Sequence, residues 1–348
     1  MDSTELFTKE EKFEKKEIKP KFDIKRDSNE EISNIWNKNK IEELELSEIF
    51  GHGNESKVYK AQASKNKKLV KVKKIISKER QTKNYNEIRI SNKLRLKNII
   101  NIYGVKEIIK DKIDSREMEY AKQGNLINFK DNLVKKSYLS ESLLCYLTYQ
   151  ILCGLKYCHM NKVLHFDIKP QNIVIDDYLV AKIIDFLVAL DYSKIKSKSI
   201  KLPYQGTCLY MAPEVIKNKT INVKDLNKVD LFSLGITLYY LAFNSFPFGL
   251  SHEDIKDNDK IYGKIMEGKK IKINDVYSKH FIDFLNQLLQ KDINERIDIN
   301  QALEHYWVKG AIILNNEKEK VCDDNNFLSY LILDHFKSFD DYLKKDIY

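Results

Sequence analysis

The sequence is poor in residues that cross-link or interrupt a chain, with 5 cysteines, 5 prolines, 11 glycines and 2 tryptophans in 348 residues. No two cysteines stand in a C-x-x-C spacing, so nothing indicates a cysteine-based metal or redox motif. Three of them, Cys145, Cys153 and Cys158, fall in an apolar stretch with helical spacing. We therefore expect reduced core cysteines in an intracellular protein of the cytoplasm or nucleus.

Signals for secretion, lipid attachment and membrane crossing are also missing. The first residues, MDSTELFTKEEK, contain no apolar run, no Gly follows Met1, and no prenylation box ends the sequence. The most apolar region, residues 231–250, is interrupted by Ser233, Gly235, Asn244, Ser245 and Pro247. This pattern predicts a buried helix and no membrane span.

The overall composition is that of a globular protein. Hydrophobic residues make up 43% of the chain, and its length is sufficient for a full core. The formal net charge is +9, but the lysines are dispersed and form no single stripe. We therefore expect no nucleic-acid partner.

Hydrophobic periodicity divides the chain into parts. Residues 1–43 form a charged extension rich in Lys, Glu and Asn. Short β-type runs follow to about residue 114, broken by one helical segment at about 84–96, and helical spacing dominates from about residue 124. Residues 310–348 are expected to form a helical tail that packs on its own domain, with a partner-binding helix as the alternative.

The segment HFDIKPQNIVI, residues 165–175, places Asp167, Lys169 and Asn172 on one short loop. A carboxylate can orient an attacking hydroxyl and accept its proton, and an ammonium group can neutralise charge on a moving phosphoryl group. An amide oxygen can bind magnesium. The three residue types at this spacing indicate phosphoryl transfer.

At this loop the sequence resembles the eukaryotic protein kinase family, serine/threonine type, whose catalytic loop reads H-R-D-x-K-x-x-x-N. The segment GTCLYMAPEVI, residues 206–216, is similar to the family's G-T-x-x-Y-x-A-P-E. The resemblance implies an α+β, bilobal fold with a small β-rich N-lobe at about 44–120 and a larger helical C-lobe at about 121–309. It also implies scaffold roles for Asp230 and for a pair formed by Glu214 and Arg296.

The segment Glu48–Ala61 carries two glycines in a predicted turn between strands, where backbone amides can approach phosphate oxygens. Two glycines alone are more often only a hairpin, so the assignment depends on the resemblance. The resemblance implies that the ATP-binding positions of this segment are Phe50, Gly51, Gly53, Ser56 and Val58, with Ser56 in place of the family's third glycine.

The strand LVKVKKI, residues 69–75, resembles the family's V-A-I-K strand, so Lys73 is expected to hold the α- and β-phosphates and Glu87 to pair with it. Taken alone, these residues also fit a solvated strand and a surface glutamate. The segment DSREMEYAKQGNL resembles the hinge between the lobes. The resemblance assigns further ATP contacts to Met118, Glu119, Tyr120, Ala121, Asn125 and Val174.

The resemblance implies ATP as cosubstrate, with Mg²⁺, or Mn²⁺ in its place, bound by Asn172 and Asp185. Asp167, Lys169, Lys73 and Glu87 are the expected catalytic residues. Lys169 and Thr207 match the serine/threonine class, so the expected partners are proteins with Ser or Thr acceptors. Asn125 and Gln171 replace acidic residues of kinases directed to basic substrates, so no such preference is expected.

Four positions depart from the family pattern. Phe166 replaces the Arg of H-R-D, so activity is expected not to depend on an activation-loop phosphate clamp. Leu187 replaces the Gly of D-F-G, and Lys71 occupies the Ala position that packs on adenine. Ser91 replaces an aliphatic residue, so an activating protein partner or the terminal extensions would have to supply an apolar side chain at this point.

These departures keep a second reading open, a pseudokinase that acts as a scaffold or allosteric binding module. A small-molecule phosphotransferase is disfavoured by the GTCLYMAPE segment, which builds the peptide-docking site in protein kinases.

Overall fold

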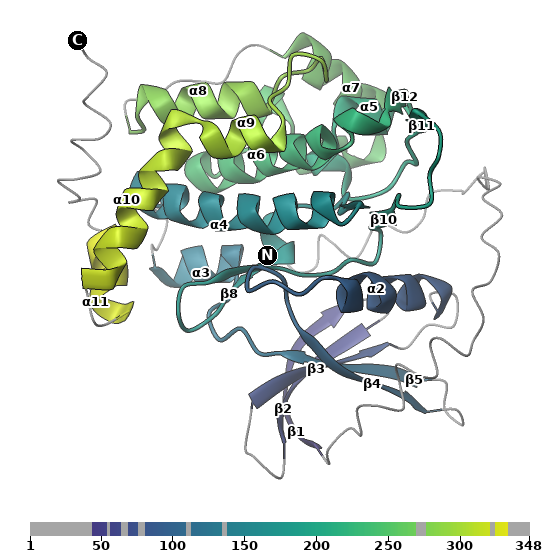
Figure 1. The fold of residues 1–348 in the computed structure, drawn as a ribbon, viewed down its shortest axis with the longest axis vertical. Helices are drawn as coiled ribbons and strands as arrows, with labels where there is room; N and C mark the ends of the chain where they lie inside the picture. The colour runs from purple at the N-terminus through teal and green to yellow at the C-terminus, as the bar shows by residue number, and fades with distance from the viewer. Residues whose placement is uncertain are drawn as a thin grey trace. The chain divides into compact units, whose positions relative to one another are not determined.

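The computed structural model describes residues 44–53, 56–63, 69–75, 81–108, 113–133, 138–268, 276–320 and 324–332. The predicted N-terminal extension and the tail beyond Ile332 lie outside the described residues. The described chain divides into two compact units. The first comprises residues up to Asn92 and Ile100–Tyr120, and the second comprises Lys93–Ile99 and the residues from Ala121 onward. The first is rich in strands and the second in helices, which confirms the predicted α+β, bilobal class (Figure 1).

The first unit is built on a five-stranded antiparallel sheet in the order β1-β2-β3-β5-β4. Its strands are β1 (Leu44–Gly53), β2 (Ser56–Ala63), β3 (Leu69–Ile75), β4 (Ile102–Ile108) and β5 (Ile113–Glu119). Pairing of Gly53 with Ser56 closes the β1–β2 hairpin, and the register shifts between Ile49 and Gly51. The two predicted glycines therefore stand at an irregular hairpin end, where residues without a Cβ are favoured.

Helix α2 (Gln81–Lys93) follows β3. The predicted helix at about 84–96 is therefore shifted, because the observed helix begins three residues earlier and ends at Lys93. The chain then turns so that the Asn98 side chain donates to the Ala181 carbonyl at 3.0 Å and Ile99 pairs with Ile183. These tertiary contacts, which periodicity cannot show, replace the last helical turn.

The second unit is mainly helical (Figure 1). Its helices are α3 (Leu126–Leu133), α4 (Glu141–Met160), α5 (Pro213–Ile216), α6 (Asn227–Phe243), α7 (Asn258–Glu267), α8 (Lys279–Leu288), α9 (Ile299–Glu304), α10 (Tyr306–Lys320) and α11 (Asp324–Ile332). Its short strands are β6 (Gly124–Asn125), β7 (Val163–Leu164), β8 (Ile173–Ile175), β9 (Ala181–Ile183), β10 (Leu190–Asp191), β11 (Ser199–Lys201) and β12 (Thr220–Asn222).

Helix α6 is the buried helix that the apolar region predicts. Thirteen of its positions, from Val229 to Ala242, are buried. Asn244, directly after the last helical residue, has a left-handed backbone, which commonly terminates a helix. None of the helices in the described ranges combines the length and the apolar character needed to cross a bilayer.

Aromatic packing joins the later helices to α4. Trp307 is fully buried between Phe281 and Phe284, and its indole Nε1 donates to Glu141 Oε1 at 2.8 Å. The second carboxylate oxygen of Glu141 accepts from the Ser278 backbone at 2.7 Å. A buried carboxylate is tolerated here because its oxygens have donors.

The described part of the tail packs on α4. The ring of Phe327 on α11 meets Tyr146 of α4 edge-on with centroids 5.5 Å apart, and Ser142 donates to the Leu331 carbonyl at 2.8 Å. Phe327 and Leu331 are fully buried. The apolar face of α11 is therefore covered by its own unit.

Candidate active site

The loop that follows β7 is fixed to α6 by one carboxylate, that of Asp230. Its Oδ1 accepts from the Phe166 backbone N–H at 2.9 Å, and its Oδ2 accepts from the His165 N–H at 3.0 Å. The same Oδ2 lies 2.8 Å from His159 Nε2. Asp230 is fully buried, so these donors replace the solvation that its charge loses.

Phe166 adopts a left-handed backbone with φ 67°, which is unusual for a residue with a side chain. Such a conformation costs roughly 1–3 kcal/mol and persists only when surrounding contacts determine it. The Asp230 bond to the Phe166 N–H is such a contact. The loop is therefore turned by a strained residue that a buried carboxylate holds.

Asp167 follows this turn and is the centre of a compact polar cluster. Its Oδ2 accepts from Asn172 Nδ2 at 2.8 Å and pairs with Lys169 Nζ at 3.1 Å. Its Oδ1 accepts from the Thr207 hydroxyl at 2.6 Å, and Lys169 also donates to that hydroxyl at 2.5 Å. The structure thus brings together three residues that the sequence selected and joins to them Thr207, 40 positions away along the chain.

Asn172 also connects the loop to the segment that carries Asp185. The Ile184 N–H donates to the Asn172 carbonyl at 2.9 Å, and His165 Nε2 lies 3.0 Å from the Ile184 carbonyl. The His165 ring meets Phe186 edge-on at 4.9 Å. These contacts flank Asp185 on both sides and fix it beside Asn172.

The two predicted metal ligands fit a hard divalent cation. The Nδ2 group of Asn172 donates to both the backbone carbonyl and the carboxylate of Asp167, so the amide oxygen is the atom left for a cation. Asp185 offers a carboxylate, and Mg²⁺ prefers oxygen ligands of these two kinds. Metal binding by Asn172 and Asp185 remains a prediction.

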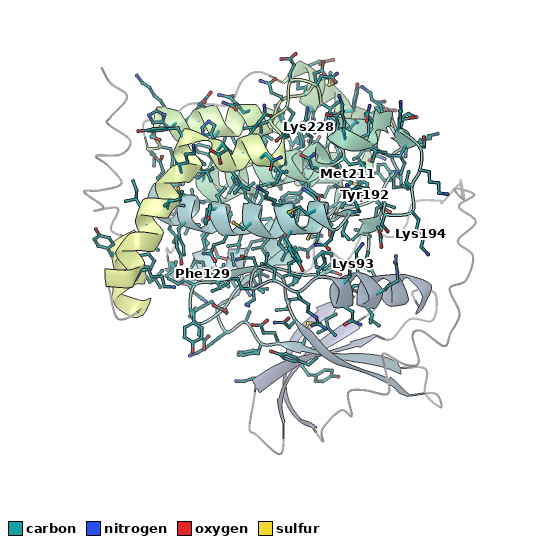
Figure 2. All side chains as sticks on the ribbon, in the orientation of Figure 1. Lys93, Phe129, Tyr192, Lys194, Met211 and Lys228 are labelled. Carbon is teal, nitrogen blue, oxygen red and sulfur yellow. The ribbon has the colours of Figure 1, made fainter. Side chains whose placement is uncertain are left out.

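The segment from Asp185 to Ile216 is ordered by contacts within the protein. Strand β10 pairs with β7, strand β11 pairs with β12, and Gln205 donates to the Val188 carbonyl at 2.8 Å. The Phe166 ring is buried in place of a cationic side chain, whereas Ser193, Ser197 and Ser199 are exposed. Lys194 of the same segment is also exposed (Figure 2).

The end of this segment is held by a buried ion pair. Arg296 donates to both carboxylate oxygens of Glu214, at 2.6 and 3.1 Å, and also to the Lys228 and Gln290 carbonyls at 2.9 Å. Both side chains are nearly inaccessible. The Glu214–Arg296 pairing expected from the sequence is therefore present. Tyr210 of the same segment is also buried, and that burial raises the pKa of its phenol, so the group stays neutral.

The first unit contains the residues predicted in the β1–β2 hairpin, in β3 and in α2. In the sheet, Lys73 is opposite Val58 and Arg116, and Lys71 is opposite Met118. The side chains of Phe50, Ser56, Val58, Lys71 and Lys73 lie outside the described part of the structure, and Gly51 and Gly53 are described only by their place in β1. Glu87 and Ser91 on α2 are buried, at 3% and 2% exposure.

Residues assigned to the hinge have local structural contacts. Glu119 Oε2 accepts from the Asn101 backbone at 3.3 Å and its side chain at 3.1 Å. Asn125 Oδ1 accepts from the N–H groups of Ile127 and Asn128 at 3.0 Å, which caps α3. Met118 and Tyr120 are half-buried, whereas Ala121 and Val174 are buried. Their roles as ATP contacts remain predictions.

Two supporting residues were not found from the sequence. His159 approaches Asp230 from α4, and the Thr237 hydroxyl donates to the Ile168 carbonyl at 3.3 Å. His159 and Thr237 lie on apolar helices, outside any motif, so the sequence does not indicate which distant residue each one contacts. The sequence could have shown only that a polar residue occupies a core position of the helical pattern.

Comparison with known proteins gives a consistent result. The family model described as Protein kinase domain matches residues 44–308. The chain is 35% identical over 249 residues to "Calcium-dependent protein kinase 6" of Plasmodium berghei (strain Anka), a match that covers 70% of this chain and 16% of that protein. It is 30% identical over 279 residues to "Aurora kinase" of Dictyostelium discoideum, covering 77% of this chain and 66% of that protein.

A third relative is "CBL-interacting serine/threonine-protein kinase 12" of Arabidopsis thaliana, 29% identical over 288 residues, which covers 80% of this chain and 56% of that protein. The matched part of these three relatives is therefore less than two thirds of their own lengths.

We predict that Gly206→Ala destabilises the protein, because Gly206 has φ +108° and a Cβ there would lie 2.3 Å from the Phe166 carbonyl oxygen. The expected loss is roughly 1–3 kcal/mol of unfolding free energy in urea titration. Gly263→Ala is the matched control, since a Cβ at this α7 position meets nothing within 4 Å. The control should be stabilised by about 0.5–1 kcal/mol. Equal effects of the two substitutions would contradict the prediction.

Proposed function

We propose that this chain, which belongs to the protein kinase family, transfers the γ-phosphate of Mg-ATP to serine or threonine hydroxyls of protein substrates. The observation that carries the proposal is the cluster around Asp167, in which Asn172, Lys169 and Thr207 hold one carboxylate. The names of relatives such as "CBL-interacting serine/threonine-protein kinase 12" support the acceptor class.

Each residue of the cluster has a role that its contacts allow. Asp167 orients the substrate hydroxyl and accepts its proton as the oxygen attacks phosphorus and the bond to the ADP oxygen breaks. Lys169 already lies 3.1 Å from Asp167, so its ammonium group stands where charge on the transferred phosphoryl group needs compensation. Asn172 orients the carboxylate through its Nδ2 group.

Each part of the nucleotide has residues assigned to it. Bound Mg-ATP supplies the phosphoryl group, and its cation, Mg²⁺ or Mn²⁺, neutralises phosphate charge. We assign the cation to Asn172 and Asp185, the α- and β-phosphates to Lys73 and its partner Glu87, and the triphosphate backbone contacts to the β1–β2 hairpin. Met118 to Ala121 would face the adenine. The burial of Glu87 supports a paired carboxylate in α2.

We further propose that transfer does not depend on phosphorylation of the activation segment, residues 185–216. Phosphate clamps need a cationic side chain, and the residue after His165 is a buried phenylalanine. The segment is instead held by β10–β7, β11–β12 and the Glu214–Arg296 pair. We also propose that an activating protein partner, or a terminal extension, supplies the apolar contact that an aliphatic residue would make at position 91.

The activity is tested by transfer of labelled γ-phosphate from Mg-ATP to degenerate peptide libraries with Ser, Thr or Tyr as the acceptor. We expect incorporation with Ser and Thr, and a loss of roughly 10²–10⁴-fold in Asp167→Asn, which removes the proton acceptor. Asp177→Asn is the matched control, because this exposed carboxylate lies outside the cluster and only approaches Lys122 at 4.0 Å.

If the parent protein incorporates no more phosphate than Asp167→Asn, the proposed enzymatic activity is contradicted. The alternative, a pseudokinase scaffold, would then account for Lys71 and Leu187. Incorporation with Tyr alone would overturn the acceptor class while leaving the phosphotransferase intact.

The second test replaces Ser193, Ser197 and Ser199 together with alanine. Because all three are exposed on the activation segment, the expected rate is within about twofold of the parent rate, as for ordinary surface substitutions. Thr207→Ala, which removes the hydroxyl between Lys169 and Asp167, should lower the rate strongly in the same assay. A triple variant as impaired as Thr207→Ala would show that segment phosphorylation is required.

A further inference from the structure

A pocket of the second unit lies where the end of α4, the segment before α6 and the start of α9 meet. Its volume is about 420 Å³, enough for one or two side chains of a bound segment. None of its lining residues belongs to the catalytic cluster or to the predicted nucleotide site. The pocket is therefore separate from the phosphate-transfer cluster, although its residue His159 also contacts Asp230.

The charged residues that line the pocket are all cationic. Lys156, Lys162 and Lys224 line it, and none of the described lining residues is acidic. Two neighbouring carboxylates are engaged elsewhere: Asp225 pairs with Lys228 at 3.4 Å, and Asp298 accepts from backbone N–H groups at the start of α9. The lysines thus create a positive field at the pocket mouth that favours an anionic partner.

The rest of the lining is largely apolar. Met160, Tyr192, Val223 and Ile299 contribute to it, and Met160 is 69% exposed. An exposed apolar side chain within a concave, cationic surface gains free energy if a partner covers it. The surface therefore combines an apolar floor with a cationic rim.

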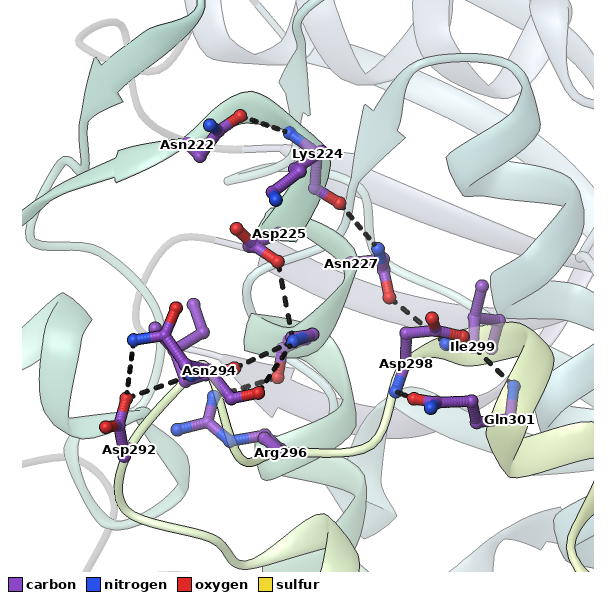
Figure 3. A network of polar contacts seen from close by, with 12 residues as sticks. Asn222, Lys224, Asp225, Asn227, Asp292, Asn294, Arg296, Asp298, Ile299 and Gln301 are labelled. Carbon is purple, nitrogen blue, oxygen red and sulfur yellow. Dashed lines mark hydrogen bonds and ion pairs between the residues drawn. The ribbon is translucent and has the colours of Figure 1, made fainter.

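Side-chain amides fix the rim (Figure 3). Asn222 Oδ1 accepts from the Lys224 N–H at 3.2 Å, and Asn227 Nδ2 donates to the Lys224 carbonyl at 3.1 Å. Asn227 Oδ1 then accepts from the Ile299 N–H at 3.1 Å, which joins the segment before α6 to α9. The backbone that carries Lys224 is held in place before a partner arrives, which lowers the entropy cost of binding.

His159 also lines the pocket, but its ring nitrogens are not available to a partner. Its Nε2 lies 2.8 Å from Asp230, and its Nδ1 is buried from solvent. Recognition by this pocket therefore depends on the lysines and on the apolar floor.

We infer that this pocket docks an acidic peptide segment, in which one aliphatic side chain covers the apolar floor and flanking carboxylates meet the lysines. The volume and the apolar lining favour a peptide over a nucleic-acid backbone or a lipid surface. Three lysines around a pocket form no continuous track for a polyanion.

The test uses the full chain and a fluorescein-labelled peptide, Glu-Asp-Glu-Leu-Glu-Asp-Glu, in fluorescence anisotropy titrations. We expect saturable binding with Kd below about 1 mM and weaker binding at higher salt. Lys162→Glu/Lys224→Glu should raise Kd by about tenfold through charge repulsion, and Lys224→Glu alone by less. A peptide with Ser in place of Leu should also bind more weakly.

Lys219→Glu is the matched control, because Lys219 is an exposed lysine of the same unit that does not line the pocket. It should leave Kd within about twofold of the parent value. Absence of saturable binding, or an equal loss in Lys219→Glu, would overturn the inference. So would lysine-dependent binding to an RNA 12-mer or to phosphatidylserine vesicles without binding to the peptide. Because binding is read directly, these results are independent of phosphate transfer.

Discussion

The arrangement of the loop that carries Asp167 depends on one buried carboxylate, that of Asp230. It receives two backbone N–H groups from the loop and faces an imidazole from α4, so it joins three parts of the second unit. Removal of the acceptor would leave buried donors without partners, each at a cost of about 1–3 kcal/mol. The strained backbone of Phe166 persists because these contacts determine it.

This dependence explains why an aromatic residue is tolerated at position 166. Asp230 contacts the backbone of Phe166, so the turn that presents Asp167 does not require an arginine side chain. The phenylalanine ring is buried, and the segment that an arginine would clamp is held instead by strand pairing and by the Glu214–Arg296 pair. Position 166 therefore carries no cation, and the loop keeps its geometry.

The sequence allowed prediction of features that depend on short spacing or on periodicity. The cluster of Asp167, Lys169 and Asn172 could be predicted because the three residues lie on one short loop. The burial of α6 could be predicted from its run of apolar residues. The distant Glu214–Arg296 pair was expected because both residues lie in segments that resemble the family, but distant contacts outside such segments could not be predicted. His159 and Asp230 are 71 positions apart along the chain. Helix α2 ends at Lys93, and Asn98, beyond its end, donates to the distant Ala181 carbonyl. The cap that Asn125 forms on α3 was likewise not predicted, and its role as an ATP contact stays a prediction.

The phosphate-transfer rate of Asp230→Asn beside Asp225→Asn tests most directly whether Asp230 positions the loop that carries Asp167. The amide keeps the size of the side chain but replaces one acceptor oxygen with a donor, so at least one loop N–H loses its partner. We expect a rate lower by roughly 10²-fold, because Asp167 is displaced, with circular dichroism showing a folded protein. Asp225→Asn should keep the parent rate. A folded Asp230→Asn protein that transfers phosphate at the parent rate would contradict the account.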